Sequence, residues 1–314
     1  MHKNHISTSL NDFLNEIEFK KNHPHTPVGL PSGLRIFDTY TNGFQKGDLI
    51  LIGAHPAMGK TAFAINIAYN ISKYFFDLEK ENQSIDKCVL YFTLDGTNLS
   101  LIPRFINLET EFSHWDRING IKDAQTEENV INSCLSLSKL PIYLSNKGNT
   151  IKEIKEEIQI VNSEQQIGCI IIDYLQLIEK DTDNYMAILN ELKKTAIRMN
   201  VPIMVLSQLK RTLEYRKNKI PKWFDIVGYT QKNDPTDKII FLYRKIYYLL
   251  NQLPRKQKYE PQNHFEQRYK KWENKCDKIR NKCKIIIAKN NLGHIGDIGV
   301  SFDFMRGIFR DAEE

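Results

Sequence analysis

The hydrophobic positions of this chain follow two alternating patterns, short continuous apolar runs and longer segments with apolar side chains at helical spacing. Continuous runs of this length are typical of strands buried on both faces. The predicted strands cover Asp48 to His55, Lys87 to Leu94, Ile142 to Leu144, Gly168 to Asp173, Ile203 to Leu206, Lys238 to Tyr243 and Lys284 to Ala288. Strands that alternate with helices indicate the α/β class, with a mostly parallel sheet and helices on both faces.

The first residues have a different pattern. Leu10, Phe13, Leu14 and Ile17 share one face of a short amphipathic helix, and two prolines interrupt any periodicity within residues 20–27. We therefore predict an amphipathic linker helix and linker over residues 1–25 and one large domain over residues 26–314. The helix either docks on a neighbouring subunit or folds back on its own domain, and the sequence leaves both alternatives open.

Composition narrows the class of protein without identifying its chemistry. The chain has 314 residues, 41% of them apolar, which is enough for one large core. It has no apolar run near the roughly 20 residues that cross a bilayer, and its start lacks the apolar core of a signal peptide. These features predict a soluble, cytoplasmic protein with no membrane partner. The net charge of +6 is mild evidence for a polyanionic partner and decides nothing alone.

The strongest chemical signal lies where the strand from Asp48 meets the following helix. The segment Gly53-Ala-His-Pro-Ala-Met-Gly-Lys-Thr61 is a phosphate loop, with Ala54 where the strict pattern has Gly. Backbone N–H groups and the helix N-terminus attract phosphate, Lys60 reaches the β- and γ-phosphates, and the Thr61 hydroxyl can hold Mg²⁺. The residues predicted around a bound nucleotide here are Ala57, Met58, Gly59, Lys60, Thr61 and Ala62.

Two further strands end in polar side chains. The run Cys169-Ile-Ile-Ile-Asp173 delivers an acidic group to the edge where parallel sheets bind ligands, so Asp173 is predicted to share Mg²⁺ with Thr61. The run Pro202-Ile-Met-Val-Leu-Ser-Gln208 ends at a neighbouring position. Gln208 either senses the γ-phosphate or is a solvated strand end.

Taken together, these motifs resemble the replicative DNA helicases of the DnaB type. The resemblance runs from about Thr26 to Arg310. The segments that carry it are Gly29-Leu-Pro-Ser-Gly-Leu-Arg-Ile-Phe-Asp38, Pro56-Ala-Met-Gly-Lys-Thr61, Ile172-Asp-Tyr-Leu-Gln-Leu177 and Ser207-Gln-Leu-Lys-Arg-Thr-Leu-Glu-Tyr-Arg216. The resemblance implies a RecA-like P-loop NTPase core that binds ATP and Mg²⁺, forms rings, and translocates 5′ to 3′ on single-stranded DNA. We expect the family's N-terminal helical domain to be missing.

Several positions depart from the family pattern. Asp95 stands where the family has a catalytic Glu that polarises the attacking water, and it is one methylene shorter. Lys289 matches an interface Lys that the resemblance assigns to catalysis, but Asn291 occupies the position of the arginine finger. Such a finger is worth about 10³ to 10⁵ in rate. Arg280 and Lys282 are possible substitutes.

The predicted DNA contacts depart as well. Where the family has an Arg-Glu-Ser-Gly stretch, this chain reads Val227-Gly-Tyr-Thr230, without the Arg. A basic insertion also covers about residues 245–282. Its aromatic residues are Tyr259, Phe265, Tyr269 and Trp272. The insertion either binds single strands by charge and stacking or is a solvated helix or helical hairpin with Phe265, Tyr269 and Trp272 on its buried face.

Two functions therefore remain open. One is an ATP-dependent DNA helicase that works as a homo-oligomeric ring. The other is a hydrolysis-deficient nucleotide-binding subunit, assembled with a true helicase, that keeps the pocket and loses turnover. An accessory protein of recombination or of mobile elements, with the same core and no ring, is a third possibility.

Overall fold

The computed structural model describes residues 6–24, 26–80, 86–112, 114–121, 123–179 and 184–312. The strands are β1 Leu49–Ala54, β2 Lys87–Thr93, β3 Ile142–Ser145, β4 Gln166–Asp173, β5 Ile203–Gln208, β6 Lys238–Tyr243, β7 Lys282–Asn290, β8 Gly296–Asp303 and β9 Ile308–Asp311. The helices are α1 Ile6–Asn22, α2 Arg35–Thr41, α3 Lys60–Lys80, α4 Asn98–Glu109, α5 His114–Asn119, α6 Ala124–Leu137, α7 Ile151–Glu164, α8 Tyr185–Met199, α9 Lys245–Leu250 and α10 Gln262–Asp277, with 3₁₀ turns η1 Leu175–Leu177, η2 Arg211–Tyr215 and η3 Trp223–Asp225.

All nine of these strands form one sheet in the order β3-β2-β4-β5-β1-β6-β7-β8-β9. The strands from β3 to β6 pair in parallel, whereas β7, β8 and β9 add antiparallel pairs at one side. The seven predicted strands are confirmed with small shifts in their ends. β8 and β9 were not predicted. β8 buries only alternate residues such as Ile298, Val300 and Phe302 and so has no continuous apolar run.

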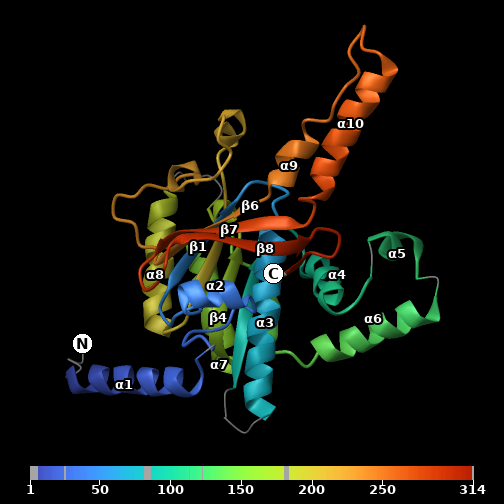
Figure 1. The fold of residues 1–314 in the computed structure, drawn as a ribbon. Coiled ribbons are helices and arrows are strands. Elements are labelled where there is room, and N and C mark those ends of the chain that lie inside the picture. The colour runs from blue at the N-terminus through green and yellow to red at the C-terminus, as the bar shows by residue number, and fades with distance from the viewer. Residues whose placement is uncertain are drawn as a thin grey trace.

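Alternate residues of the central strands supply two separate cores. In β1, Ile50 and Ile52 pack on the side of α2 and α3, while Leu49 and Leu51 pack on the side of α7 and α8. Figure 1 shows the resulting layers, with α3 running along one face of the sheet. The expected helices on both faces are confirmed. Because both faces of β1 are buried, its backbone is held firmly at the edge where the phosphate loop begins.

The amphipathic helix near the N-terminus is confirmed as α1, and its apolar side chains are uncovered. Leu10, Phe13, Leu14 and Ile17 are each at least half exposed, at 53%, 57%, 60% and 50%. Figure 1 shows α1 lying apart from the sheet. Within the residues that the structure describes, the helix is therefore not folded back on its own domain. The proposed boundary near residue 25, which itself lies outside the described residues, stays a prediction.

The predicted insertion forms an arm, defined here as residues 245–282. It contains α9 and α10, and Figure 1 shows α10 extending away from the sheet. Its small core joins Ile246, Leu249 and Cys276 with the partly buried Trp272. The Trp272 indole N–H donates to the Leu249 carbonyl at 3.0 Å. The helical alternative is thus confirmed for Trp272, which packs against α9.

Two of the cysteines lie where the strand pattern places them. Cys88 and Cys169 are buried free thiols within β2 and β4. Among the described helices, none has both the length and the apolar content needed to cross a bilayer.

Candidate nucleotide site

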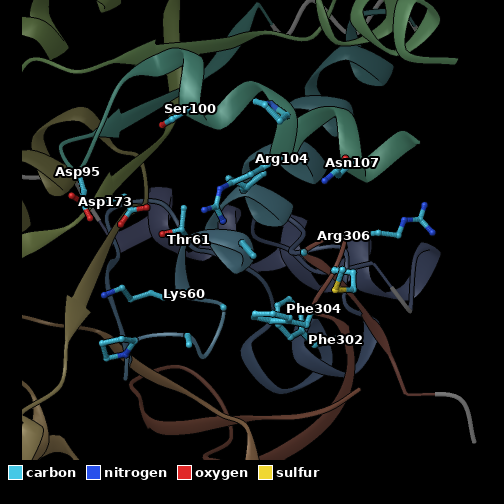
Figure 2. Close-up of a pocket in the computed structure, with 18 of the residues that line it drawn as sticks. Lys60, Thr61, Asp95, Ser100, Arg104, Asn107, Asp173, Phe302, Phe304 and Arg306 are labelled. Carbon is cyan, nitrogen blue, oxygen red and sulfur yellow. The ribbon is translucent and has the colours of Figure 1, made fainter. Parts of the chain in front are cut away.

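A cavity of about 700 Å³ opens at the carboxyl ends of the parallel strands. Figure 2 shows that its charged side chains come from the phosphate loop, from the ends of β2 and β4, from α4, and from the turn between β8 and β9. Of the residues predicted for the site, those that line the cavity are Ala57, Gly59, Lys60, Thr61, Ala62, Asp95, Asp173 and Gln208. Segments far apart in sequence therefore meet at one edge of the sheet, as open parallel sheets lead one to expect.

The backbone of the phosphate loop has the geometry of an anion cradle. Ala57 and Gly59 have positive φ angles of 63° and 92°, which turn successive N–H groups toward one side. A Cβ on Gly59 would lie 2.8 Å from the Phe302 ring, so only glycine fits there. Ala54, at the position of the pattern's first Gly, is the buried last residue of β1 and has no positive φ angle. The departure at Ala54 therefore leaves the cradle intact.

A buried arginine supports this loop from beneath. The Arg244 guanidinium donates to the Ala57 carbonyl at 3.2 Å, and the Arg244 backbone N–H contacts the Met58 sulfur at 3.3 Å. The guanidinium lies between the rings of Phe302 and Phe304, 4.7 and 4.8 Å from their centroids. Met58 is buried and does not line the cavity, so it contacts the support rather than a ligand.

Lys60 and Asp173 form the charged floor of the cavity. Burial lowers the pKa of Lys60 to about 8, against the opposing effect of Asp173 and Asp95. Burial also raises the pKa of Asp173, although hydrogen bonds from Thr61 and Tyr91 favour its charged form. The Tyr91 hydroxyl donates to Asp173 at 3.1 Å. Both pKa shifts mean that burial disfavours the charged form of the side chain. An anion bound beside Lys60 and a cation bound beside Asp173 would supply the missing countercharge.

Gln208 is held at the cavity by a neighbouring glutamine. The Gln176 side chain donates to the Ser207 hydroxyl at 2.9 Å and accepts from the Gln208 N–H at 3.0 Å. The Gln208 carbonyl accepts from the N–H of Val227 at 3.2 Å, at the start of the predicted DNA loop. Gln208 therefore connects the cavity to residues 227–230 through the backbone at the end of β5.

The opposite wall of the cavity comes from the segment after β2. Asp95 follows that strand and is exposed, near enough to Asp173 for its negative charge to raise the pKa of that carboxyl. Figure 2 shows Arg104 reaching from α4 into the cavity on the side of Thr61. Arg306, in the turn between β8 and β9, donates to the Thr110 carbonyl at 3.1 Å and so ties this turn to the segment after α4.

A polar chain leads from the phosphate loop toward the arm. The His55 ring nitrogen lies 3.0 Å from the Glu214 carboxylate, which in turn accepts from the Tyr247 hydroxyl at 3.3 Å. His55 precedes the anion cradle, Glu214 follows β5, and Tyr247 belongs to α9. The phosphate loop and the arm therefore both contact the carboxylate of Glu214, which lies in the segment after β5.

Lys289 lies at the other edge of the sheet. Its ammonium contacts Asp234 at 2.7 Å and the Thr236 carbonyl, just before β6 begins. The Asn291 side chain contacts Asp237 at 3.3 Å. The cavity is about 20 Å away, the length of a six-residue strand. Lys289 therefore does not meet the predicted site within one chain, and its catalytic role stays a prediction.

Arg280 and Lys282 are poorly placed to replace the missing finger. Both precede or begin β7, whereas Asn291 follows its last residue. Arg280 is also paired with Asp277 at 2.5 Å. They lie at the opposite end of a nine-residue strand from Asn291, and the suggested substitution stays a prediction.

Arg104 and Arg244 were not identified as site residues from the sequence. Arg244 directly follows the predicted strand Lys238 to Tyr243, but nothing local shows that it lies under the Ala57 carbonyl, 187 residues away. Arg104 lies on α4 with ordinary helical neighbours. Its only local signal is its place nine residues after Asp95, which does not reveal the direction of the side chain.

Relatives of this chain are replicative helicases. Residues 29–311 match the family model described as the DnaB-like helicase C terminal domain. A Replicative DNA helicase DnaB of Rickettsia bellii (strain RML369-C) is 28% identical over 300 residues, covering 93% of this chain and 59% of the relative. A Replicative DNA helicase DnaC of Bacillus subtilis (strain 168) is 31% identical over 294 residues, covering 91% and 57%. The chain thus spans less than two thirds of the length of these relatives.

Solved structures resemble the fold over nearly the whole chain. One structure, whose title describes it as an ATPase domain, has a TM-score of 0.78 at 25% identity, covering 99% of this chain and 100% of that one. The structure titled "The Structure Of A DnaB-Like Replicative Helicase And Its Interactions With Primase" has a TM-score of 0.77 at 26% identity, covering 98% and 69%.

Proposed function

This chain belongs to the family of DnaB-like helicase C-terminal domains, and on that premise we propose that it is a motor that couples ATP hydrolysis to movement along single-stranded DNA. The fold is the RecA-like one of helicase ATPase domains, and the family implies nucleotide binding. The observation that carries the proposal is the convergence of Lys60, Thr61, Asp95, Asp173 and Gln208 on one cavity.

The residues present suit a magnesium nucleotide. The cradle formed by Ala57 and Gly59 would receive the phosphates, with Lys60 beside the β- and γ-phosphates. Thr61 and Asp173 supply oxygen ligands of the kind that Mg²⁺ prefers, and Asp173 is buried with incomplete countercharge. When bound, the ion would neutralise the charge that develops on the phosphate oxygens.

The chain's own side chains account for the remaining steps. Asp95 would orient the attacking water, and Arg104 would stabilise negative charge from the same chain. Gln208 would report the state of the γ-phosphate to residues 227–230, because its carbonyl accepts the Val227 N–H. Lys289 lies too far away to act in its own cavity, so it would act on a nucleotide held by the next copy of the ring.

A second candidate function is favoured by the neutral finger position. Asn291 contacts Asp237 and carries no charge that could reach a neighbouring phosphate. Asp95 is also shorter than the family's Glu. A nucleotide-binding subunit that fixes the state of an assembly with a true helicase would keep Lys60 and Asp173 and need neither a finger nor a Glu.

Steady-state ATP hydrolysis separates the two functions. We expect turnover that oligo-dT stimulates and that Lys60→Ala abolishes, with Lys46→Ala, an exposed lysine outside the cavity, as the control. Magnesium-ATP binding measured on the same samples shows whether the pocket is occupied. Tight binding without turnover would overturn the motor in favour of the regulatory subunit, and no binding would overturn both.

A further inference from the structure

The arm holds the net positive charge of the chain. Residues 245–282 contain eleven Lys and Arg against four Asp and Glu, a net charge of +7. The rest of the chain has 33 basic and 34 acidic residues, a net charge of −1. The net charge of +6 is therefore the sum of a nearly neutral body and a strongly basic arm.

Charges on α10 are separated by face. Lys271, Lys275 and Lys278 are spaced four and three residues apart and so share one side of the helix and its last turn. The acidic residues Glu266, Glu273 and Asp277 share another side, on which Lys270 is the basic neighbour. On a helix whose polar face is simply exposed to solvent, opposite charges typically alternate at this spacing. On α10 the two signs lie on separate sides, which leaves Lys271, Lys275 and Lys278 as a stripe of positive charge.

The third side of α10 explains why the arm is rigid enough to present this stripe. Phe265, Tyr269 and Trp272 contact one another in sequence, with centroids 6.0 and 5.5 Å apart, and Trp272 is bonded to α9. Trp272 is partly buried against α9, whereas Tyr269 stays 37% exposed. Trp272 therefore supports the helix more than it offers a face to a ligand.

The loop between the two helices is also held in place. Arg268 makes two bonds to the Glu260 carboxylate, at 3.0 and 2.7 Å, and one to the Arg255 carbonyl at 2.9 Å. The Tyr259 ring next to this clamp is 88% exposed, with the Lys258 ammonium 5.5 Å from its centroid. An exposed ring beside exposed cations is a stacking position for a nucleobase.

The basic surface continues where the arm joins the body. The segment 210–222 has six basic residues and one acidic residue. Lys219 from this segment lies 5.9 Å from the ring of Tyr248 in α9. A strand that follows the arm would thus remain near positive charge on reaching the sheet.

We propose that the arm is a second, sequence-independent binding site for single-stranded nucleic acid, in which the lysine stripe of α10 contacts phosphates and Tyr259 stacks on a base. It goes beyond the motor proposed above because it lies outside the cavity and residues 227–230. It requires no nucleotide. A helix face of lysines, together with an exposed ring in the loop before the same helix, favours a nucleic acid strand over an acidic protein, which would have no base to stack.

Binding of labelled oligo-dT to the full chain, measured by fluorescence anisotropy without nucleotide, tests the site. The arm variant Lys271→Ala/Lys275→Ala/Lys278→Ala is compared with Lys46→Ala/Lys73→Ala/Lys139→Ala, which removes the same charge from exposed positions elsewhere. For single strands, the logarithmic salt slope changes by about 0.7 per phosphate contact, so the arm variant is expected to lose about two units. The control is expected to keep the wild-type slope.

Tyr259→Ala distinguishes a strand from other polyanions. We expect it to weaken oligo-dT binding by roughly 5- to 150-fold, the range for one stacked base, and to leave heparin binding unchanged. Equal slopes for the arm variant and the control would overturn the site. An unchanged affinity of Tyr259→Ala for oligo-dT would overturn the assignment to single strands and leave a general polyanion surface. Circular dichroism verifies that each variant keeps its helices, and the assay is independent of ATP turnover.

Discussion

The sheet edge and the arm handle charge in opposite ways. At the sheet edge, Lys60, Asp173 and Arg244 are largely withdrawn from water, and burial shifts the pKa of each in the direction that favours its neutral form. On the arm, the lysine stripe of α10 is exposed and makes no ion pair with a carboxylate of the described residues. The interactions of buried charges depend on their geometry and change little with salt concentration. The interactions of exposed charges depend on how many charges there are and weaken as salt screens them. The same chain thus has one site that a single substitution can destroy and one that weakens by increments.

The largest expected effect concerns packing behind the sheet edge. Phe63 is fully buried on α3 and packs edge-on against Phe37 and Phe309, with centroids 6.3 and 5.1 Å away. Because it joins α2, α3 and β9, Phe63→Ala is expected to lower the free energy of unfolding by about 3 to 5 kcal/mol. Urea unfolding measures this loss. A loss below that of Trp272→Ala in the arm would contradict the contrast between body and arm.

Arg104 tests whether the cavity supplies its own cation. Since it reaches toward Thr61 from the same chain, we expect Arg104→Ala to lower kcat by about 10² to 10³, as loss of one positioned donor does at other sites. Arg104→Lys would recover part of the rate, because the charge remains without the planar fork. Turnover and KM are measured together. A change in KM alone would limit Arg104 to ground-state binding.

A buried carboxyl should make the stability of the body depend on pH. Burial raises the pKa of Asp38 from 3.8 to about 6, although the Ser32 N–H bonds to it and favours the charged form. The folded state therefore holds a proton that the unfolded state releases. This contribution to stability is complete below about pH 4 and is lost as the pH rises through about 6, a change of about 3 kcal/mol.

Asp38→Asn provides the matched comparison for that titration. The difference in unfolding free energy between wild type and variant should change between pH 4 and pH 6 and then level off. A constant difference across this range would mean that Asp38 titrates alike in the folded and unfolded states.

The smallest effect is expected in the arm. Trp272 is only partly buried and holds α10 against α9. Trp272→Ala should loosen the arm and reduce oligo-dT binding, with less than about 1 kcal/mol lost from the unfolding of the body, because the arm packs on itself. Hydrogen exchange over residues 245–282 measures the loosening. Equal loss of protection in β1 would show that arm and body unfold together.

Strands with two buried faces were predictable from sequence, whereas β8, with one buried face, was not. β1 and β4 appear as unbroken apolar runs, whereas β8 alternates apolar residues with Asp297, Gly299 and Ser301. The residues of the candidate site also divide into those that the sequence predicted and those that it did not. Lys60 and Thr61 belong to a local motif, and Asp173 ends a strand, so spacing was sufficient. Arg104 reaches the cavity, and Arg244 reaches the phosphate loop beneath it, only through tertiary packing, which spacing does not encode.

The contacts of α10 also explain why the arm was harder to interpret. From sequence alone, Phe265, Tyr269 and Trp272 fitted either stacking on bases or packing. The choice depends on where α9 lies, and its carbonyl at Leu249 accepts the indole N–H. Tyr259 lies in the loop before α10 rather than on the helix face that packs against α9, and its side chain is 88% exposed.

The placement of Lys289 has a consequence for how activity would scale with the amount of protein. Its ammonium is bound beside Asp234 at one edge of the sheet, and the phosphate loop opens at the other. If Lys289 acts on a nucleotide, each working unit comprises the loop of one copy and the lysine of the next. Specific activity would then fall on dilution, and in mixtures of Lys60→Ala and Lys289→Ala proteins some interfaces would regain both intact halves.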